Sequence, residues 1–168
     1  GSGKTTALRK MLYLCLKEGG QVFGLPPETL PVFLRLRRFD TTLLEQPLEF
    51  FIDLDLAEMA EGADLPKGFG RRLWQRGHLL LLFDGLDEIS DATLRQQVAQ
   101  KLEREVFQLS HKKIWTLISS RSAGFEPVRG HFSNTFEFEV QPLKSGQIEQ
   151  FVTRWFKAAF IKQERGTS

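Results

Sequence analysis

The chain has 168 residues, which is room for one globular domain at roughly 150 residues per domain. Hydrophobic residues make up 41% and charged residues 26% of it, ordinary globular values that exclude a disordered, collagen-like or coiled-coil chain. The net charge of +2, from 23 basic and 21 acidic residues, is too balanced for a surface that wraps a polyanion, which argues against nucleic acid as a partner.

The single cysteine, Cys15, cannot form an internal disulfide, and the three histidines show no zinc-ligand spacing. This composition favours a reducing compartment, and we expect a cytoplasmic protein. The longest apolar runs, residues 11–16 and 79–83, fall far short of the roughly 18 residues of a membrane-spanning helix, so no span is expected. The chain opens at Gly1 without an initiator methionine, which predicts that the natural N-terminus lies upstream.

The first half of the chain alternates between helical and strand patterns. Residues 4–18 carry apolar side chains at helical spacing and end at Gly19-Gly20, which predicts an amphipathic helix. Residues 32–37 alternate at their end, which is typical of an edge strand with one buried face. Residues 45–60 predict a weaker helix, residues 61–66 a break, and residues 69–76 a short helix.

The second half begins with residues 79–83, a continuous apolar run typical of a strand buried on both faces of a parallel sheet. Residues 94–106 predict a helix and residues 114–118 a second central strand. We then expect a loop at 122–133, an alternating edge strand at 136–140, and a closing helix from about 148 to 159 capped by Ser145. Strands alternating with helices indicate an α/β fold with a parallel sheet.

The tetrapeptide Gly3-Lys4-Thr5-Thr6 stands directly before the first helix and matches the end of the phosphate-binding loop G-x-x-x-x-G-K-[ST]. In such a loop, glycines let backbone N–H groups close around phosphates, lysine reaches the β and γ phosphates, and the threonine hydroxyl binds Mg²⁺. Gly1, Ser2, Gly3, Lys4, Thr5 and Thr6 are therefore candidate nucleotide-binding residues. The motif's first glycine would precede Gly1, and a chance Gly-Lys-Thr at a helix start is the alternative.

The apolar run at 79–83 leads into a cluster of acids, in the order Asp84, Asp87, Glu88. Ligands bind at the carboxyl edge of open α/β sheets, so Asp84 is a candidate Mg²⁺ residue. Glu88 is placed to polarise a water that attacks the γ phosphate, and Asp87 could share either task. A solvated acidic turn is the alternative.

A third candidate group, Ser119-Ser120-Arg121, follows the second central strand. The guanidinium of Arg121 could sense a γ phosphate at this edge. The alternative is an arginine that caps a loop or pairs with a surface acid.

Together these features resemble the NACHT domain of the STAND class of P-loop NTPases. The match rests on residues 3–9, on the run LLLLFDGLDEI with a small residue after Asp84, on residues 119–121, and on residues 138–143 with the helix that follows. The resemblance implies a three-layer α/β/α sandwich with strand order 5-1-4-3-2, in which the first strand would precede this chain. It assigns residues 1–160 to the NACHT domain and residues 161–168 to a polar tail, and the compact spacing is similar to bacterial members.

The resemblance also implies ATP or GTP with Mg²⁺ as ligands and a nucleotide-dependent oligomerisation switch in a signalling or defence protein, with slow hydrolysis. Effector and sensor domains would lie outside the chain. Two alternatives stay open: a scaffold that holds nucleotide without turnover, and an AAA-type motor, which the D-[small]-x-D-E pattern disfavours. Since the sheet would lack its first strand, we predict that the isolated 168 residues fold poorly and bind nucleotide weakly.

Overall fold

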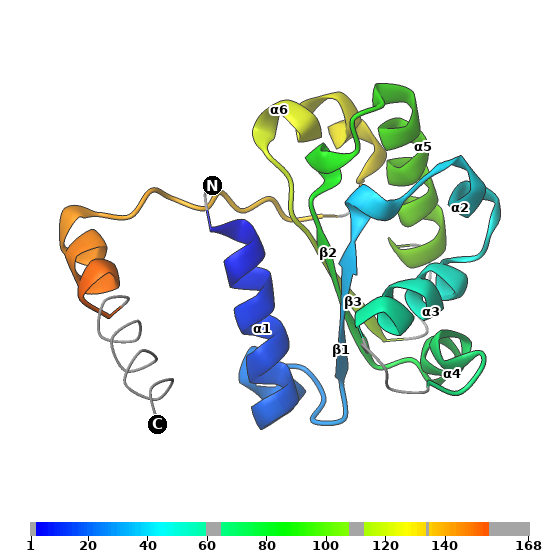
Figure 1. Cartoon of the computed structure of the whole chain (residues 1–168), viewed down its shortest axis with the longest axis horizontal. Coiled ribbons are helices and arrows are strands. Elements are labelled where there is room, and N and C mark those ends of the chain that lie inside the picture. Colours follow the sequence, from blue (N-terminus) through cyan, green and yellow to red (C-terminus); the bar gives the residue numbers. More distant parts are fainter. Residues whose placement is uncertain (1–2, 60–64, 108–112, 134, 155–168) are drawn as a thin grey trace, which may run out of the picture. The chain divides into compact units, whose positions relative to one another are not determined.

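The computed structural model describes residues 3–59, 65–107, 113–133 and 135–154, and Figure 1 traces its helices and strands. The chain separates into two compact units, one reaching from residue 3 to residue 137 and the other starting at residue 138. The first unit holds the sheet and most of the helices. The second contributes one described helix, at residues 145–154.

The sheet of the first unit is parallel and has the order β1-β2-β3, with β1 at Leu30–Arg35, β2 at Leu79–Asp84 and β3 at Ile114–Ile118. Leu79 of β2 pairs in register with Leu30 on one side and with Ile114 on the other. Every residue of β2 is buried, as its continuous apolar sequence predicts for a central strand. In the expected order 5-1-4-3-2, β1 corresponds to strand 2, β2 to strand 3 and β3 to strand 4.

Helices cover both faces of this sheet, because successive side chains of a strand point to opposite faces (Figure 1). Helix α1 (Lys4–Glu18) packs Leu8 and Cys15 against Phe33, Leu80 and Leu82. The opposite face packs against α2 (Thr41–Glu45), α3 (Leu48–Met59), α4 (Phe69–Arg76) and α5 (Ala92–Leu102). The described residues therefore form the three layers of an α/β/α sandwich.

The helices agree with the sequence patterns at 4–18 and at 69–76, where the predicted bounds are confirmed. The helix expected over residues 45–60 is confirmed as α3, which begins at Leu48, three residues later than predicted. Pro47 precedes it, and a proline disfavours helical backbone at the residue before it, which separates α3 from the short helix α2 that ends at Glu45. The break expected at 61–66 lies mostly outside the described residues.

Three further expectations need correction. Val32, Phe33 and Leu34 of β1 are all buried, so this edge strand has both faces covered, by α1 and α3. The residues of β3 are only partly buried, and β3 forms an edge of the described sheet rather than a central strand. The segment 122–133, expected as a loop, contains helix α6 (Ser122–Phe125) and the 3₁₀ segment η6 (Glu126–His131).

The predicted edge strand at residues 136–140 is wrong, because these residues form no strand, and Phe136 and Phe138 are 90% and 88% exposed. The expected strand order places the first strand beside this segment. No strand precedes α1 among the described residues.

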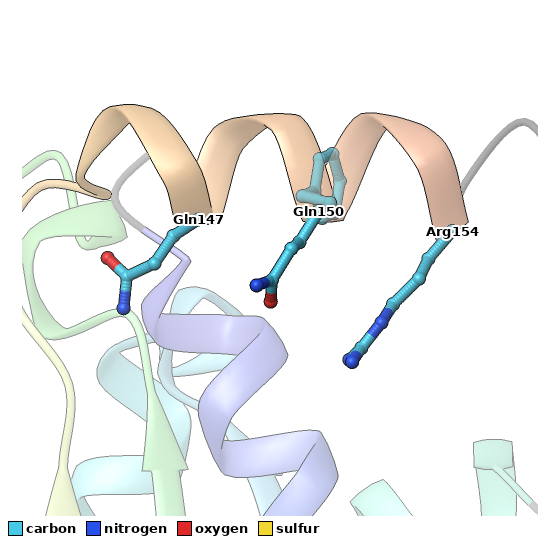
Figure 2. Close-up of a pocket in the computed structure, with 4 residues that line it drawn as sticks. Gln147, Gln150 and Arg154 are labelled. Atoms are coloured by element: carbon cyan, nitrogen blue, oxygen red, sulfur yellow. The ribbon is translucent and has the colours of Figure 1, made fainter.

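In the second unit, the closing helix is described from residue 145 to residue 154, and its predicted remainder lies outside the described residues. The N–H groups of Gln147 and Ile148 donate to the carbonyl of Lys144, so the helix begins directly after Lys144 and the predicted cap at Ser145 is wrong. Figure 2 shows Gln147, Gln150 and Arg154 projecting from one side of this helix, around a shallow hollow. All of its described lining residues belong to this one helix.

Buried charged side chains join α3 to the end of β1 and join the helices to one another. Asp55 of α3 is 0% exposed, and its Oδ1 lies 3.1 Å from Arg35 Nη2 and 2.7 Å from Arg38 Nη1. Buried Lys101 of α5 donates to the carbonyl of Gln46 at 2.7 Å, which ties α5 to the turn between α2 and α3.

In the described ranges, no helix combines the length and apolar composition that a membrane span requires.

Candidate functional site

The candidate site lies at the carboxyl edge of the sheet, where α1 begins and where β2 and β3 end. Gly3 precedes α1 with a φ of +76°, a left-handed conformation that glycine adopts without strain. This turn places Thr5 in the first helical turn, with its hydroxyl 3.1 Å from Oδ1 of Asp84. The structure therefore brings together two predicted site residues that stand 79 positions apart in the sequence.

Asp84 is the last residue of β2 and is 8% exposed. Besides Thr5, its Oδ1 accepts a hydrogen bond from the hydroxyl of Ser119 at 2.7 Å. Ser119 follows β3 directly, and its Oγ also accepts from the N–H of Gly85 at 2.9 Å. Ser119 belongs to the third candidate group predicted from the sequence, in which only Arg121 was given a role. The sequence feature that could have indicated its contact with Asp84 is its position: a hydroxyl residue directly after β3, the strand that pairs with β2.

Asp87 and Arg121 contact each other. The Arg121 backbone N–H donates to Asp87 Oδ1 at 3.0 Å, and Arg121 Nε lies 3.3 Å from Asp87 Oδ2. Both oxygens of this mostly buried carboxylate therefore engage one residue, while the Arg121 side chain itself is largely exposed. This geometry matches the alternative in which the arginine pairs with an acid.

Glu88 lies in an exposed position on the 3₁₀ turn η3 (Leu86–Glu88), directly after β2. Gly85 starts this turn with a φ of +80°, and a Cβ atom added to it would lie 2.8 Å from Cδ of Glu88. The glycine thus leaves space for the Glu88 side chain to fold over the turn. Unlike Asp87, Glu88 presents its carboxylate at the surface.

The remaining predicted residues lie at the start of the chain. Lys4 is half-buried and Thr6 is exposed, both in the first turn of α1. Gly1 and Ser2 lie outside the described residues. The first-turn N–H groups of this 15-residue helix make its N-terminus a favourable place for an anion.

The residues present fit a magnesium–nucleotide complex. Hydroxyl and carboxylate oxygens, as in Thr5 and Asp84, are ligands that Mg²⁺ prefers, and it usually takes its other ligands from phosphates and water. Within the described part of the chain, no group of three or more His, Cys, Asp or Glu side chains gathers into a metal cluster. Thr5 and Asp84 would leave the remaining Mg²⁺ ligands to phosphate and water, next to a helix N-terminus.

Comparison with known proteins identifies a family but no individual relative. No curated protein and no solved structure matches the chain. The family model described as the NACHT domain matches residues 1–159, nearly the whole chain. The parallel three-layer architecture agrees with this match, and the chain belongs to the NACHT domain family of nucleotide-binding P-loop NTPases.

Proposed function

We propose that this NACHT domain is a nucleotide-dependent switch that controls self-association of a larger cytoplasmic signalling or defence protein and hydrolyses ATP or GTP slowly. The observation that carries the proposal is the contact between Thr5 and Asp84. It joins the first turn of α1, where phosphates bind, to the end of β2, where the acids stand. A nucleotide bound there contacts two separate elements of the sandwich at once, so its presence can be transmitted to the rest of the domain.

In this proposal the start of α1 binds the phosphates. The turn at Gly3 and the N–H groups that follow it surround the β phosphate, with Gly1, Ser2 and Thr6 completing the loop, and the Lys4 ammonium attracts the β and γ phosphates. The Thr5 hydroxyl and the Asp84 carboxylate hold Mg²⁺, with Asp84 acting through water. Bound Mg²⁺ neutralises charge on the phosphate oxygens.

Glu88 is the proposed general base. Its carboxylate is exposed beside the Asp84 edge, where it can accept a proton from the attacking water. Asp87 is less suited to this task because both of its oxygens engage Arg121. In this proposal, Asp87 binds Arg121 while no nucleotide is present. When the ion pair between them breaks, Arg121 is released to bind the γ phosphate.

Single-turnover hydrolysis of ATP and of GTP, with Mg²⁺, by the full-length protein tests the proposal. Glu88→Gln should retain nucleotide binding and lose roughly 10²- to 10⁴-fold in hydrolysis rate, as expected for a general base. Glu45→Gln, an equally conservative change at an exposed position on α2, is the matched control and should hydrolyse normally. Lys4→Ala should lose nucleotide affinity.

The outcomes separate the switch from the scaffold alternative. Wild-type turnover that falls in Glu88→Gln with binding intact supports hydrolysis with Glu88 as the base. Unchanged hydrolysis in Glu88→Gln would transfer that role to Asp87. Bound nucleotide without turnover in either form means a scaffold. For the switch itself, analytical ultracentrifugation with a non-hydrolysable triphosphate should give a larger assembly than with the diphosphate, and equal masses would contradict it.

A further inference from the structure

Ser119 is hydrogen-bonded to four consecutive residues at the end of β2. Its N–H donates to the carbonyl of Phe83 at 2.8 Å, and its carbonyl accepts from the N–H of Leu86 at 2.9 Å. Its hydroxyl donates to Asp84 Oδ1 at 2.7 Å and accepts from the N–H of Gly85 at 2.9 Å. With 7% of its surface exposed, Ser119 continues the pairing of β2 and β3 past the end of both strands.

The two backbone bonds fix where the Ser119 hydroxyl lies, and the hydroxyl in turn fixes the carboxylate. A hydroxyl has one proton to donate and lone pairs to accept with, and here the Gly85 N–H occupies the acceptor side. The proton therefore points at Asp84 Oδ1, the same oxygen that Thr5 approaches from α1. Hydrogen bonds from two different elements to one oxygen restrict rotation of the carboxylate about its terminal torsion, which is otherwise broad.

We propose that Ser119 is a positioning residue that orients the Asp84 carboxylate toward the Mg²⁺ of the bound nucleotide. The inference rests on the proposed roles of Thr5 and Asp84. Ser119 does not bind the metal in this proposal. It acts through Asp84, which holds Mg²⁺ through a water molecule, because partners that hydrogen-bond to the groups around a metal set the direction and the basicity of those groups.

The neighbouring Ser120 offers a matched control. Its hydroxyl donates to the carbonyl of Arg121 at 3.0 Å and takes no part in the contacts of Asp84. Ser120→Ala therefore removes a hydroxyl one residue away from Ser119 and leaves the hydrogen bonds of Asp84 unchanged.

The test is the Mg²⁺ dependence of nucleotide binding by the full-length protein, followed with the fluorescent analogues mant-ATP and mant-GTP. Ser119→Ala should raise the Mg²⁺ concentration that supports half-maximal binding by about 10- to 100-fold, the usual effect of losing a partner of a metal ligand. Binding in EDTA should stay at the wild-type level, because the phosphate contacts of α1 are untouched. Ser120→Ala should keep the wild-type Mg²⁺ requirement, and Ser119→Thr, which retains a hydroxyl, should restore it.

A thermal melt without nucleotide accompanies each titration, since a purely structural role would lower stability without moving the Mg²⁺ requirement. Should Ser119→Ala lose its cooperative melt, Ser119→Cys replaces it, because a thiol has a similar shape and is a weaker donor. A folded Ser119→Cys protein should still shift the Mg²⁺ requirement upward. Loss of the cooperative melt in both variants would assign Ser119 a structural role and overturn the proposal.

Two other results would overturn it in distinguishable ways. If folded Ser119→Ala or Ser119→Cys binds with the wild-type Mg²⁺ requirement, or if Ser120→Ala shifts it equally, only the role of Ser119 fails. If the wild-type protein binds neither analogue, or binds both without any effect of Mg²⁺, then the proposed function of the Thr5–Asp84 edge fails, and the inference about Ser119 fails with it.

Discussion

Gly124 of α6 lies so close to Asp87 that even one methyl group has no room. A Cβ atom at Gly124 would stand 2.3 Å from Cβ and 2.8 Å from Cα of Asp87, distances at which one of the two segments must move. Neither atom is the end of a flexible side chain, so the shift falls on the backbone of the turn that carries the acids. Overpacking of this kind costs about 1–3 kcal/mol.

Gly124→Ala also has a favourable component, because alanine reduces the conformational entropy of the unfolded chain by about 0.4–1 kcal/mol. We therefore expect Gly124→Ala to lower the free energy of unfolding by about 1.3 kcal/mol, the difference between the mid-values of these two effects, about 2 and about 0.7 kcal/mol. Gly130→Ala is the control, since nothing lies within 4 Å of its added Cβ atom, and it should be neutral or slightly stabilising. Urea denaturation of both variants of the full-length protein measures the difference. Equal stability of the two would refute the claim that α6 is packed directly on the Asp87 turn.

Two further predictions concern stability. Asp55→Ala should lower the free energy of unfolding by about 3 kcal/mol, because it leaves Arg35 and Arg38 without their buried partner. Glu58→Ala, at a more exposed position in the same cluster, should lower it by less than about 1 kcal/mol. Similar losses of the two variants in urea denaturation would contradict this. The Thr42 hydroxyl and the Leu43 N–H hold the pKa of Asp40 below its ordinary value, so its contribution is complete above about pH 4 and is lost as pH falls further. Asparagine is an equally good helix cap, so Asp40→Asn should keep the stability near pH 7 and lose less stability than the wild type as the pH falls. Thermal melts from pH 7 to pH 3 measure this, and melts of Asp40→Asn that overlay those of the wild type would show that Asp40 does not contribute to the pH dependence.

The sequence predicts an element of this fold well where local pattern and tertiary environment agree. The strand β2 is buried on both faces, as its unbroken apolar run predicts. Helix α4 has the predicted bounds, since Gly68 and Gly77 stand at its two ends. The segment 136–140 shows the opposite case, because alternation records which side chains can face a core but not whether a neighbouring strand is there to pair with.

The same distinction applies to the candidate site. Thr5 and Asp84 could be named as candidates because each belongs to a motif with a recognisable local spacing. The contacts of Ser119 and Asp87 depend instead on the register between β2 and β3, which places the end of one strand beside the end of the other. No pattern within either segment specifies that Asp87 faces Arg121, so this pairing emerges only from the assembled sheet.

The register of the sheet also constrains how the protein is made. Leu79 pairs with Leu30, synthesised long before it, and with Ile114, synthesised long after it, so neither ladder of β2 closes locally. Pairings between such distant residues form slowly, and unpaired strand edges promote aggregation while they persist. Until Ile118 has left the ribosome, the most apolar strand of the chain has at most one partner. We therefore expect the interval between the synthesis of β2 and that of β3 to be one in which the nascent chain is prone to aggregate.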